Sequence, residues 1–216
     1  MLQTFVRTAV AVTCATLFAA SPVRAADSRI VVRVYDMAAG DATARAAALR
    51  TAGQAMAGAG LVVDWRDCSR GGAAHPCRTV RSAGEMVVRI MPTSVPGAPP
   101  ELGFASVDPS GRATVIATVY YDIVQQVANR TGLGVDALLG RAIAHEIGHL
   151  LLRAPGHGHN GLMRPLWTDA ELARNRPEDW TFSDEESRQL RAAAREPEAF
   201  VAGGGDGGGA VDQAGR

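Results

Sequence analysis

Two histidines four residues apart enclose a glutamate, and this spacing is suited to metal chemistry. His145 and His149 fall on a predicted helix over residues 135–153, so both imidazoles leave the same helix face one turn apart. Such a pair can hold one zinc ion. Glu146 points to one side of that face. Its carboxylate can therefore act as general base toward a zinc-bound water that attacks a carbonyl group, without being a metal ligand itself.

A catalytic zinc site needs a third protein ligand and one open coordination position. Pro155 disfavours helical geometry at the residue before it, and Gly156 permits a sharp reversal, so the chain can fold back beneath the metal. His157 is the first histidine after that reversal and is the predicted third ligand. His159 is the possible alternative ligand, and Glu171, further along the chain, is another.

Residues 142–167 resemble the metzincin metallopeptidases, and the matrixins among them in particular. The pattern of that family is His-Glu-x-x-His-x-x-Gly-x-x-His, followed by a turn that places a methionine under the zinc. The residues that match this pattern are His145, Glu146, His149 and, as the methionine of the turn, Met163 in Gly-Leu-Met-Arg-Pro.

The sequence departs from the metzincin pattern between the second histidine and the turn. The glycine and the third histidine of the family would fall at Leu152 and Pro155, and neither residue fits. The match is restored if the connection is two residues longer, so that Gly156-His157 stands for the family's Gly-His. The resemblance then also implies His157 as the third zinc ligand.

The metzincin resemblance implies a metalloendopeptidase that cleaves a peptide or protein substrate. In matrixins, the stretch after the methionine turn lines the pocket beyond the scissile bond, which would give that place to Leu166 and Trp167. A different class of function stays open: a non-catalytic protein-binding module on a metallopeptidase fold, with zinc as a structural clip.

The elements that must position these residues indicate an α+β fold. The β-branched runs and turn formers predict strands, and the alanine-rich and apolar-periodic stretches predict helices. The predicted strands are 29–36, 61–65, 85–91, 102–107 and 113–119, and the predicted helices are 41–59, 120–130, 135–153 and 183–195. We expect one metzincin-like domain over residues 27–196, with a mixed, mostly parallel sheet, an active-site helix and a C-terminal helix.

The two ends of the chain differ from its middle. Residues 1–25 have the layout of a secretory signal peptide, which predicts a secreted or periplasmic protein; an uncleaved anchor is the alternative. Residues 197–216 form a glycine-rich tail that we expect to be disordered. In an oxidising compartment, Cys68 and Cys77 are expected to form a disulfide, with a pair of metal-binding thiolates as the alternative.

The charge of the chain argues against polyanionic partners. The full sequence has a formal net charge of zero, and the chain without residues 1–25 keeps 20 basic and 22 acidic residues. Nothing in this balance favours nucleic acid or an anionic membrane surface. We therefore expect no nucleic-acid partner and no membrane contact after signal cleavage. We also expect a monomer, with a peptide or protein as its substrate.

Overall fold

The computed structural model describes residues 28–38, 40–69, 76–82, 84–94, 101–107, 113–153 and 156–196. The predicted signal peptide and glycine-rich tail lie outside these residues, as does Pro155 in the predicted reversal. Among the helices within the described ranges, none has the length and hydropathy of a membrane span.

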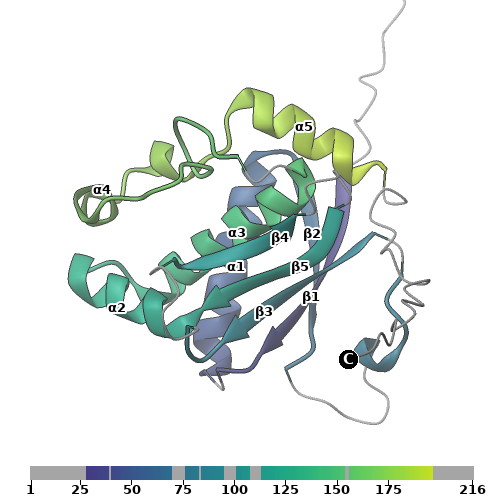
Figure 1. Ribbon diagram of the computed structural model, residues 1–216, viewed down its shortest axis with the longest axis horizontal. Helices are drawn as coiled ribbons and strands as arrows, with labels where there is room; N and C mark the ends of the chain where they lie inside the picture. Colours follow the sequence, from purple (N-terminus) through teal and green to yellow (C-terminus); the bar gives the residue numbers. More distant parts are fainter. Residues whose placement is uncertain are drawn as a thin grey trace, which may run out of the picture.

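A five-stranded sheet forms the centre of the domain (Figure 1). The strands are β1 (Ser28–Asp36), β2 (Leu61–Asp67), β3 (Glu85–Met91), β4 (Gly103–Val107) and β5 (Ala113–Tyr120). Their order is β2-β1-β3-β5-β4, and all neighbours are parallel except β4, which pairs antiparallel with β5 at one edge. The prediction of an α+β domain with a mixed, mostly parallel sheet is confirmed.

Helices pack against this sheet, and some of them begin with side-chain caps. They are α1 (Ala42–Gly58), α2 (Tyr121–Thr131), α3 (Val135–Leu152), α4 (Asp169–Arg174) and α5 (Asp184–Ala194), with 3₁₀ turns η1 (Pro76–Arg78) and η2 (Pro177–Trp180). The Asp41 carboxylate accepts a hydrogen bond from the Ala44 amide at the start of α1. At the start of α5, Ser183 and Glu186 form a capping box.

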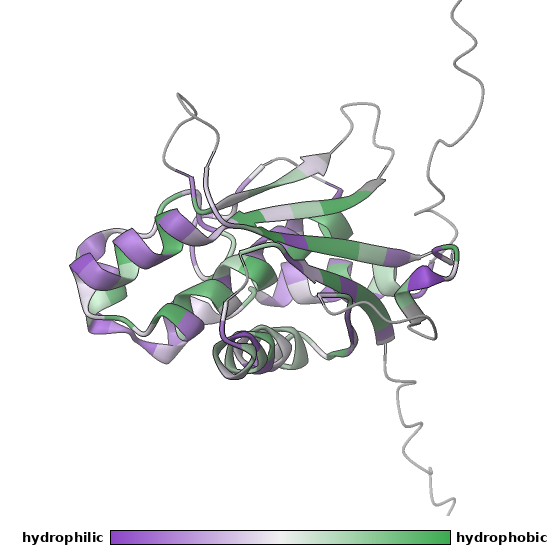
Figure 2. Ribbon diagram, turned by 90° about the horizontal axis from the view of Figure 1, so that it is seen from below, coloured by the Kyte–Doolittle hydropathy of each residue, from purple (hydrophilic) through white to green (hydrophobic). Residues whose placement is uncertain are grey.

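The active-site helix predicted from the sequence is α3, which is buried on nearly all sides. It packs against α1, and both helices lie on one face of the sheet (Figure 1). The two helices cross closely, because a Cβ atom on Gly140 of α3 would overlap the carbonyl oxygen of Ala48 in α1. Hydrophobic residues run along the strands of the sheet, while the helices show both hydrophobic and hydrophilic residues (Figure 2). The apolar core thus holds α3 in a fixed position.

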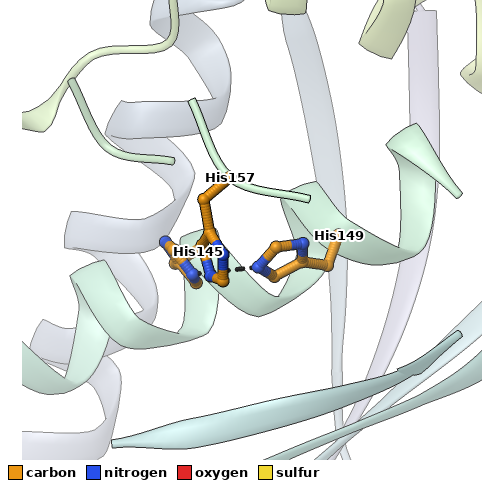
Figure 3. Close-up of side chains that lie close together, drawn as sticks. All are labelled: His145, His149 and His157. Atoms are coloured by element: carbon orange, nitrogen blue, oxygen red, sulfur yellow. Dashed lines mark hydrogen bonds between the residues drawn. The ribbon is translucent and has the colours of Figure 1, made fainter. Parts of the chain in front are cut away.

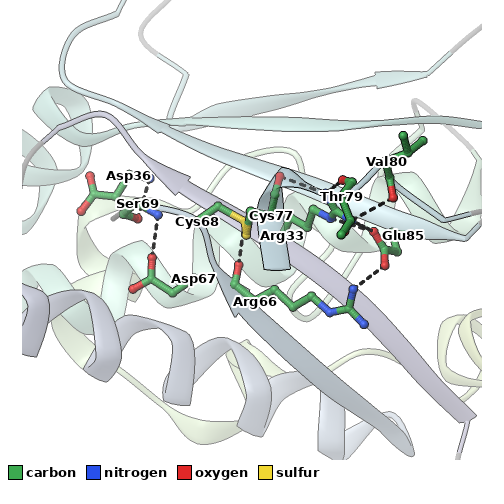
Figure 4. Close-up of a disulfide and its surroundings, with 10 residues drawn as sticks. All are labelled: Arg33, Asp36, Arg66, Asp67, Cys68, Ser69, Cys77, Thr79, Val80 and Glu85. Carbon is green, nitrogen blue, oxygen red and sulfur yellow. Dashed lines mark hydrogen bonds and ion pairs between the residues drawn. A yellow bond between two sulfur atoms is a disulfide. The ribbon is translucent and has the colours of Figure 1, made fainter. Parts of the chain in front are cut away.

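A disulfide joins Cys68, just after β2, to Cys77 in η1 (Figure 4). The pairing excludes the alternative in which these two cysteines bind metal as thiolates. Next to the disulfide, the buried Arg33 of β1 donates to the carbonyl oxygen of Thr79 at 2.9 Å and to the carboxylate of Glu85 at 2.7 Å. The disulfide thus holds η1 at the end of β2, and the hydrogen bond from Arg33 holds Thr79 beside β1.

Candidate metal centre

Three imidazoles converge at the C-terminal half of α3 (Figure 3). His145 and His149 come from α3 and are buried, whereas His157 comes from the segment after the helix and is exposed. One potential ligand nitrogen from each ring lies within 4.8 Å of the other two, and the Nε2 atoms of His145 and His149 are 3.0 Å apart. Two nitrogen ligands of a tetrahedral zinc ion lie about 3.3 Å apart. The cluster therefore has the size and the donor set of a zinc site.

The orientation of His145 is fixed by the backbone of the turn that follows the site. Its Nδ1–H donates to the carbonyl oxygen of Leu162 at 2.7 Å, which leaves Nε2 to face the other imidazoles. Burial, and after it the neighbouring His149 and His157, lower the pKa of His145 to about 4. The ring is therefore neutral at physiological pH, which is the form that binds a metal.

The loop that carries His157 is closed by backbone contacts from distant segments. The Gly158 amide donates to the carbonyl oxygen of Met163 at 2.8 Å. Gly161 adopts a positive φ of 70°, and a Cβ atom there would overlap the carbonyl oxygen of Thr181. Glycine is thus required at this close approach, and the segment before α5 supports the loop that presents His157.

Met163 lies against α3 beside the metal cluster. Its side chain is 1% exposed, and its sulfur contacts the backbone of Gly148, the residue before His149. The neighbouring Leu162 accepts the hydrogen bond from His145. The turn that contains Leu162 and Met163 therefore contacts α3 beside both His145 and His149. The structure thus places Met163, the predicted methionine of the turn, against the helix that carries His145 and His149.

Glu146 is buried at the same site without a hydrogen-bond donor. Its side chain lines the same cavity as the three histidines, and its Oε2 atom has no hydrogen-bond partner among the described residues. A Cβ atom on Gly103 of β4 would lie 3.2 Å from its Oε1 atom, so glycine leaves room for the carboxyl group. Burial, and then the charge of Glu101, raise the pKa of Glu146 to about 8. Such a carboxyl group can take up and release a proton near neutral pH.

A cavity of about 690 Å³ opens at the histidines and Glu146. Leu166 and Trp167, the predicted pocket residues, both line it. The Trp167 ring stands edge-on to His145 with ring centroids 5.5 Å apart, while Leu166 is 70% exposed. The structure therefore brings both residues to the cavity at which the metal cluster lies.

One wall of the cavity comes from α2, for which the sequence predicts a helix but no place at the site. Its lining residues are Ile123, Gln126, Val127 and Arg130. These residues are separated by three, one and three positions, so they lie on a single face of the helix. The signal in the sequence was the presence of Gln126 and Arg130 on an otherwise apolar stripe, which is unusual for a face that packs only into a core.

The two alternative ligands lie apart from the cluster. His159 is exposed, and the metal-binding group found within the described ranges does not include it. The Glu171 carboxylate binds Arg164 through Oε1, and through Oε2 it accepts hydrogen bonds from the amide and hydroxyl of Thr168 at 2.9 and 2.7 Å. Glu171 thus serves as a helix-capping and ion-pairing residue at the start of α4 rather than as a neighbour of the histidines.

No protein-family model matches the chain, and no curated protein matches it in sequence. Among solved structures, it is similar to an archaemetzincin from Methanopyrus kandleri, with a TM-score of 0.49 and 15% sequence identity over 78% of this chain and 97% of that one. It is also similar to a zinc-dependent peptidase from Methanocorpusculum labreanum, with a TM-score of 0.49 and 17% identity over 74% of this chain and 99% of that one. Neither likeness is close enough to place the chain in a family.

Proposed function

We propose that this chain is an exported zinc-dependent endopeptidase of metzincin type. The observation that carries the proposal is the convergence of three imidazoles beside a buried carboxyl group that has no hydrogen-bond donor among the described residues, all at the wall of one cavity. Export is supported by the features of residues 1–25 and by the disulfide between Cys68 and Cys77.

His145, His149 and His157 would hold the zinc ion, His145 through Nε2 because its Nδ1 donates to Leu162. When bound, zinc would supply a Lewis acid that acidifies a water molecule and polarises a substrate carbonyl group. With these three protein ligands, a four-coordinate zinc ion would keep one position for water or substrate, as catalytic zinc sites require.

Glu146 would move the proton in this reaction. Its carboxylate oxygens lie at the same cavity wall as the histidines, so one of them can accept a proton from the attacking water and then donate it to the leaving amine. The hydrogen bond from His145 to Leu162 holds that imidazole in place during the reaction. Burial raises the pKa of Glu146 and so makes its carboxylate a stronger base for the first transfer.

The substrate would bind along β4. This strand is at the edge of the described sheet, and Gly103, Phe104 and Ala105 all line the cavity. An extended peptide can add to such an edge through main-chain hydrogen bonds. Phe104 on β4 and Leu166 across the cavity both expose apolar surface to such a peptide. An edge strand is open along its length, which suits cleavage within a chain.

The test compares the wild type with Glu146→Gln and a control, Glu185→Gln, which changes an exposed carboxylate on α5. Each zinc-loaded mature chain is incubated with casein and a peptide library, with and without a chelator. We expect chelator-sensitive cleavage by the wild type and control, and a loss in kcat of about 10²- to 10⁴-fold in Glu146→Gln with zinc content unchanged.

Full activity in Glu146→Gln would show that the assigned role of Glu146 is wrong. Zinc binding with no cleavage by the wild type would favour the non-catalytic binding module instead.

A further inference from the structure

The cavity extends away from the metal cluster along the facing sides of α2 and α3. The residues that α3 contributes are Ala142, His145, Glu146 and His149, again one helical face. Only residues 132–134 connect the two helices, so the C-terminal end of α2 lies near the first residue of α3. His145 is ten residues further along α3, which is roughly 15 Å at the helical rise. Arg130, near the end of α2, therefore borders the part of the cavity far from the histidines.

An ion pair spans the cavity wall at this distant end. Arg130 of α2 donates from Nε to Oδ2 of Asp169 at 2.8 Å and from Nη2 to Oδ1 at 3.0 Å. Asp169 is the first residue of α4, which lies next to α2 (Figure 1). Both side chains line the cavity, and both are about half exposed, at 56% and 54%. The pair thus contributes two opposite charges, and no net charge, to the cavity wall.

Apolar side chains from three helices line the cavity together with the polar Gln126 of α2. Ile123 and Ala142 are buried on α2 and α3, and Leu172 is buried on α4. A side chain that enters from the metal site therefore meets these hydrocarbon surfaces, together with the Gln126 amide, on its way to the ion pair. A charged side chain would lose its hydration along these walls and would meet a pair that is already neutralised.

We propose that the Arg130–Asp169 ion pair forms the end wall of a substrate side-chain pocket and makes the site select a long, uncharged side chain next to the scissile bond. The proposal rests on the proposed peptidase function and names the residues that set its specificity. Because the two charges balance, removal of either one leaves a net charge at the end of the pocket. The sign of that charge determines which side chain gains affinity.

Two variants test this inference through shifts of opposite sign. Asp169→Asn leaves Arg130 as the charged group and should improve acceptance of a glutamate side chain. Arg130→Gln leaves Asp169 and should improve acceptance of a lysine side chain. In each variant, we expect kcat/KM for the favoured charged side chain, divided by kcat/KM for leucine, to rise by about three- to fivefold. This is the range for a pair of exposed charges. General loosening of the pocket would not move the two variants in opposite directions.

The matched controls are Glu185→Gln and Arg188→Gln. These residues form an ion pair on α5 with side chains 60% and 62% exposed, and neither lines the cavity. Each control variant removes one charge from an ion pair of similar exposure that lies outside the cavity. Each should therefore leave the preference among substrate side chains unchanged.

The experiment uses the zinc-loaded mature chain and two readouts. The first is kcat/KM for peptides that differ only in having leucine, glutamate or lysine directly after the scissile bond. The second is the dissociation constant, by calorimetry, of peptide hydroxamates with the same three side chains. Since a hydroxamate chelates zinc, its binding reports on the pocket without any turnover.

The outcomes separate this inference from the proposed function. Opposite shifts in hydroxamate binding without cleavage by the wild type would support the pocket and overturn the peptidase. Cleavage by the wild type with unchanged preferences in both variants, or with shifts of the same sign, would overturn the role of the ion pair alone. Failure of all three hydroxamates to bind the zinc-loaded wild type would also overturn the proposed pocket.

Discussion

The sulfur of Met163 packs against the backbone of Gly148, so that a Cβ atom on Gly148 would lie only 2.6 Å from it. The same Cβ atom would lie 3.0 Å from the ring of Phe182. Met163 and Phe182 are both buried, which leaves little space for either side chain to move. The contact joins the turn after the metal site to α3 at the residue before His149.

The variant Gly148→Ala tests how much the site depends on this contact. The added methyl group would displace Met163 or Phe182 and so overpack the core, at a cost of about 1–3 kcal/mol in the free energy of unfolding. We expect a lower midpoint in urea and weaker zinc binding, because the displaced turn also holds His145 through Leu162.

Gly58→Ala is the control for this variant. Gly58 is the last residue of α1, and a Cβ atom there would meet nothing within 4 Å. We expect its stability to be unchanged or slightly higher, since alanine loses less backbone entropy on folding. Wild-type stability and zinc affinity in Gly148→Ala would mean that the close contact with Met163 is not needed.

His157 and His159 offer a direct comparison between a proposed ligand and a near neighbour. Both are exposed and two residues apart, but only His157 lies with His145 and His149. We expect His157→Ala to weaken zinc binding by more than about a hundredfold, because loss of a partner outside the ligand set already costs about 10- to 100-fold. His159→Ala should retain wild-type affinity. Calorimetric titration of both variants decides the point, and the reverse order of affinities would make His159 the ligand.

Glu171 gives the fold a defined acid sensitivity. Its hydrogen bonds from Thr168, together with the ion pair to Arg164, lower the pKa of Glu171 to about 2. Because the folded pKa is below the ordinary value of 4.5, the carboxylate stabilises the fold above about pH 4.5. That contribution is lost as the pH falls from about 4.5 toward about 2.

Thermal unfolding of the wild type and Glu171→Gln across pH 6 to pH 2 measures this contribution. The variant should be less stable at pH 6, and the difference between the two melting temperatures should shrink as the pH falls through this range. A difference that stays constant across the whole range would show that the Glu171 carboxylate does not titrate as the structure requires.

The sequence by itself determined the local part of the site. His145, Glu146 and His149 lie on one helix, so the helical period alone sets their relative positions. The starts of α1 at Asp41 and of α5 at Ser183 are local in the same sense, since each cap involves residues only three positions apart. Alternating and periodic apolar residues indicated all five strands of the sheet in the same way.

The tertiary structure alone decided how distant segments meet at the metal. The shape of the loop with His157 depends on backbone contacts to Thr181, which follows some twenty residues later and is placed by the packing of α5. The pairing of Arg130 with Asp169, and the edge position of β4, also depend on which elements pack side by side. Local periodicity sets the type of each element, but the proximity of residues far apart in the chain follows from the burial of the whole apolar core.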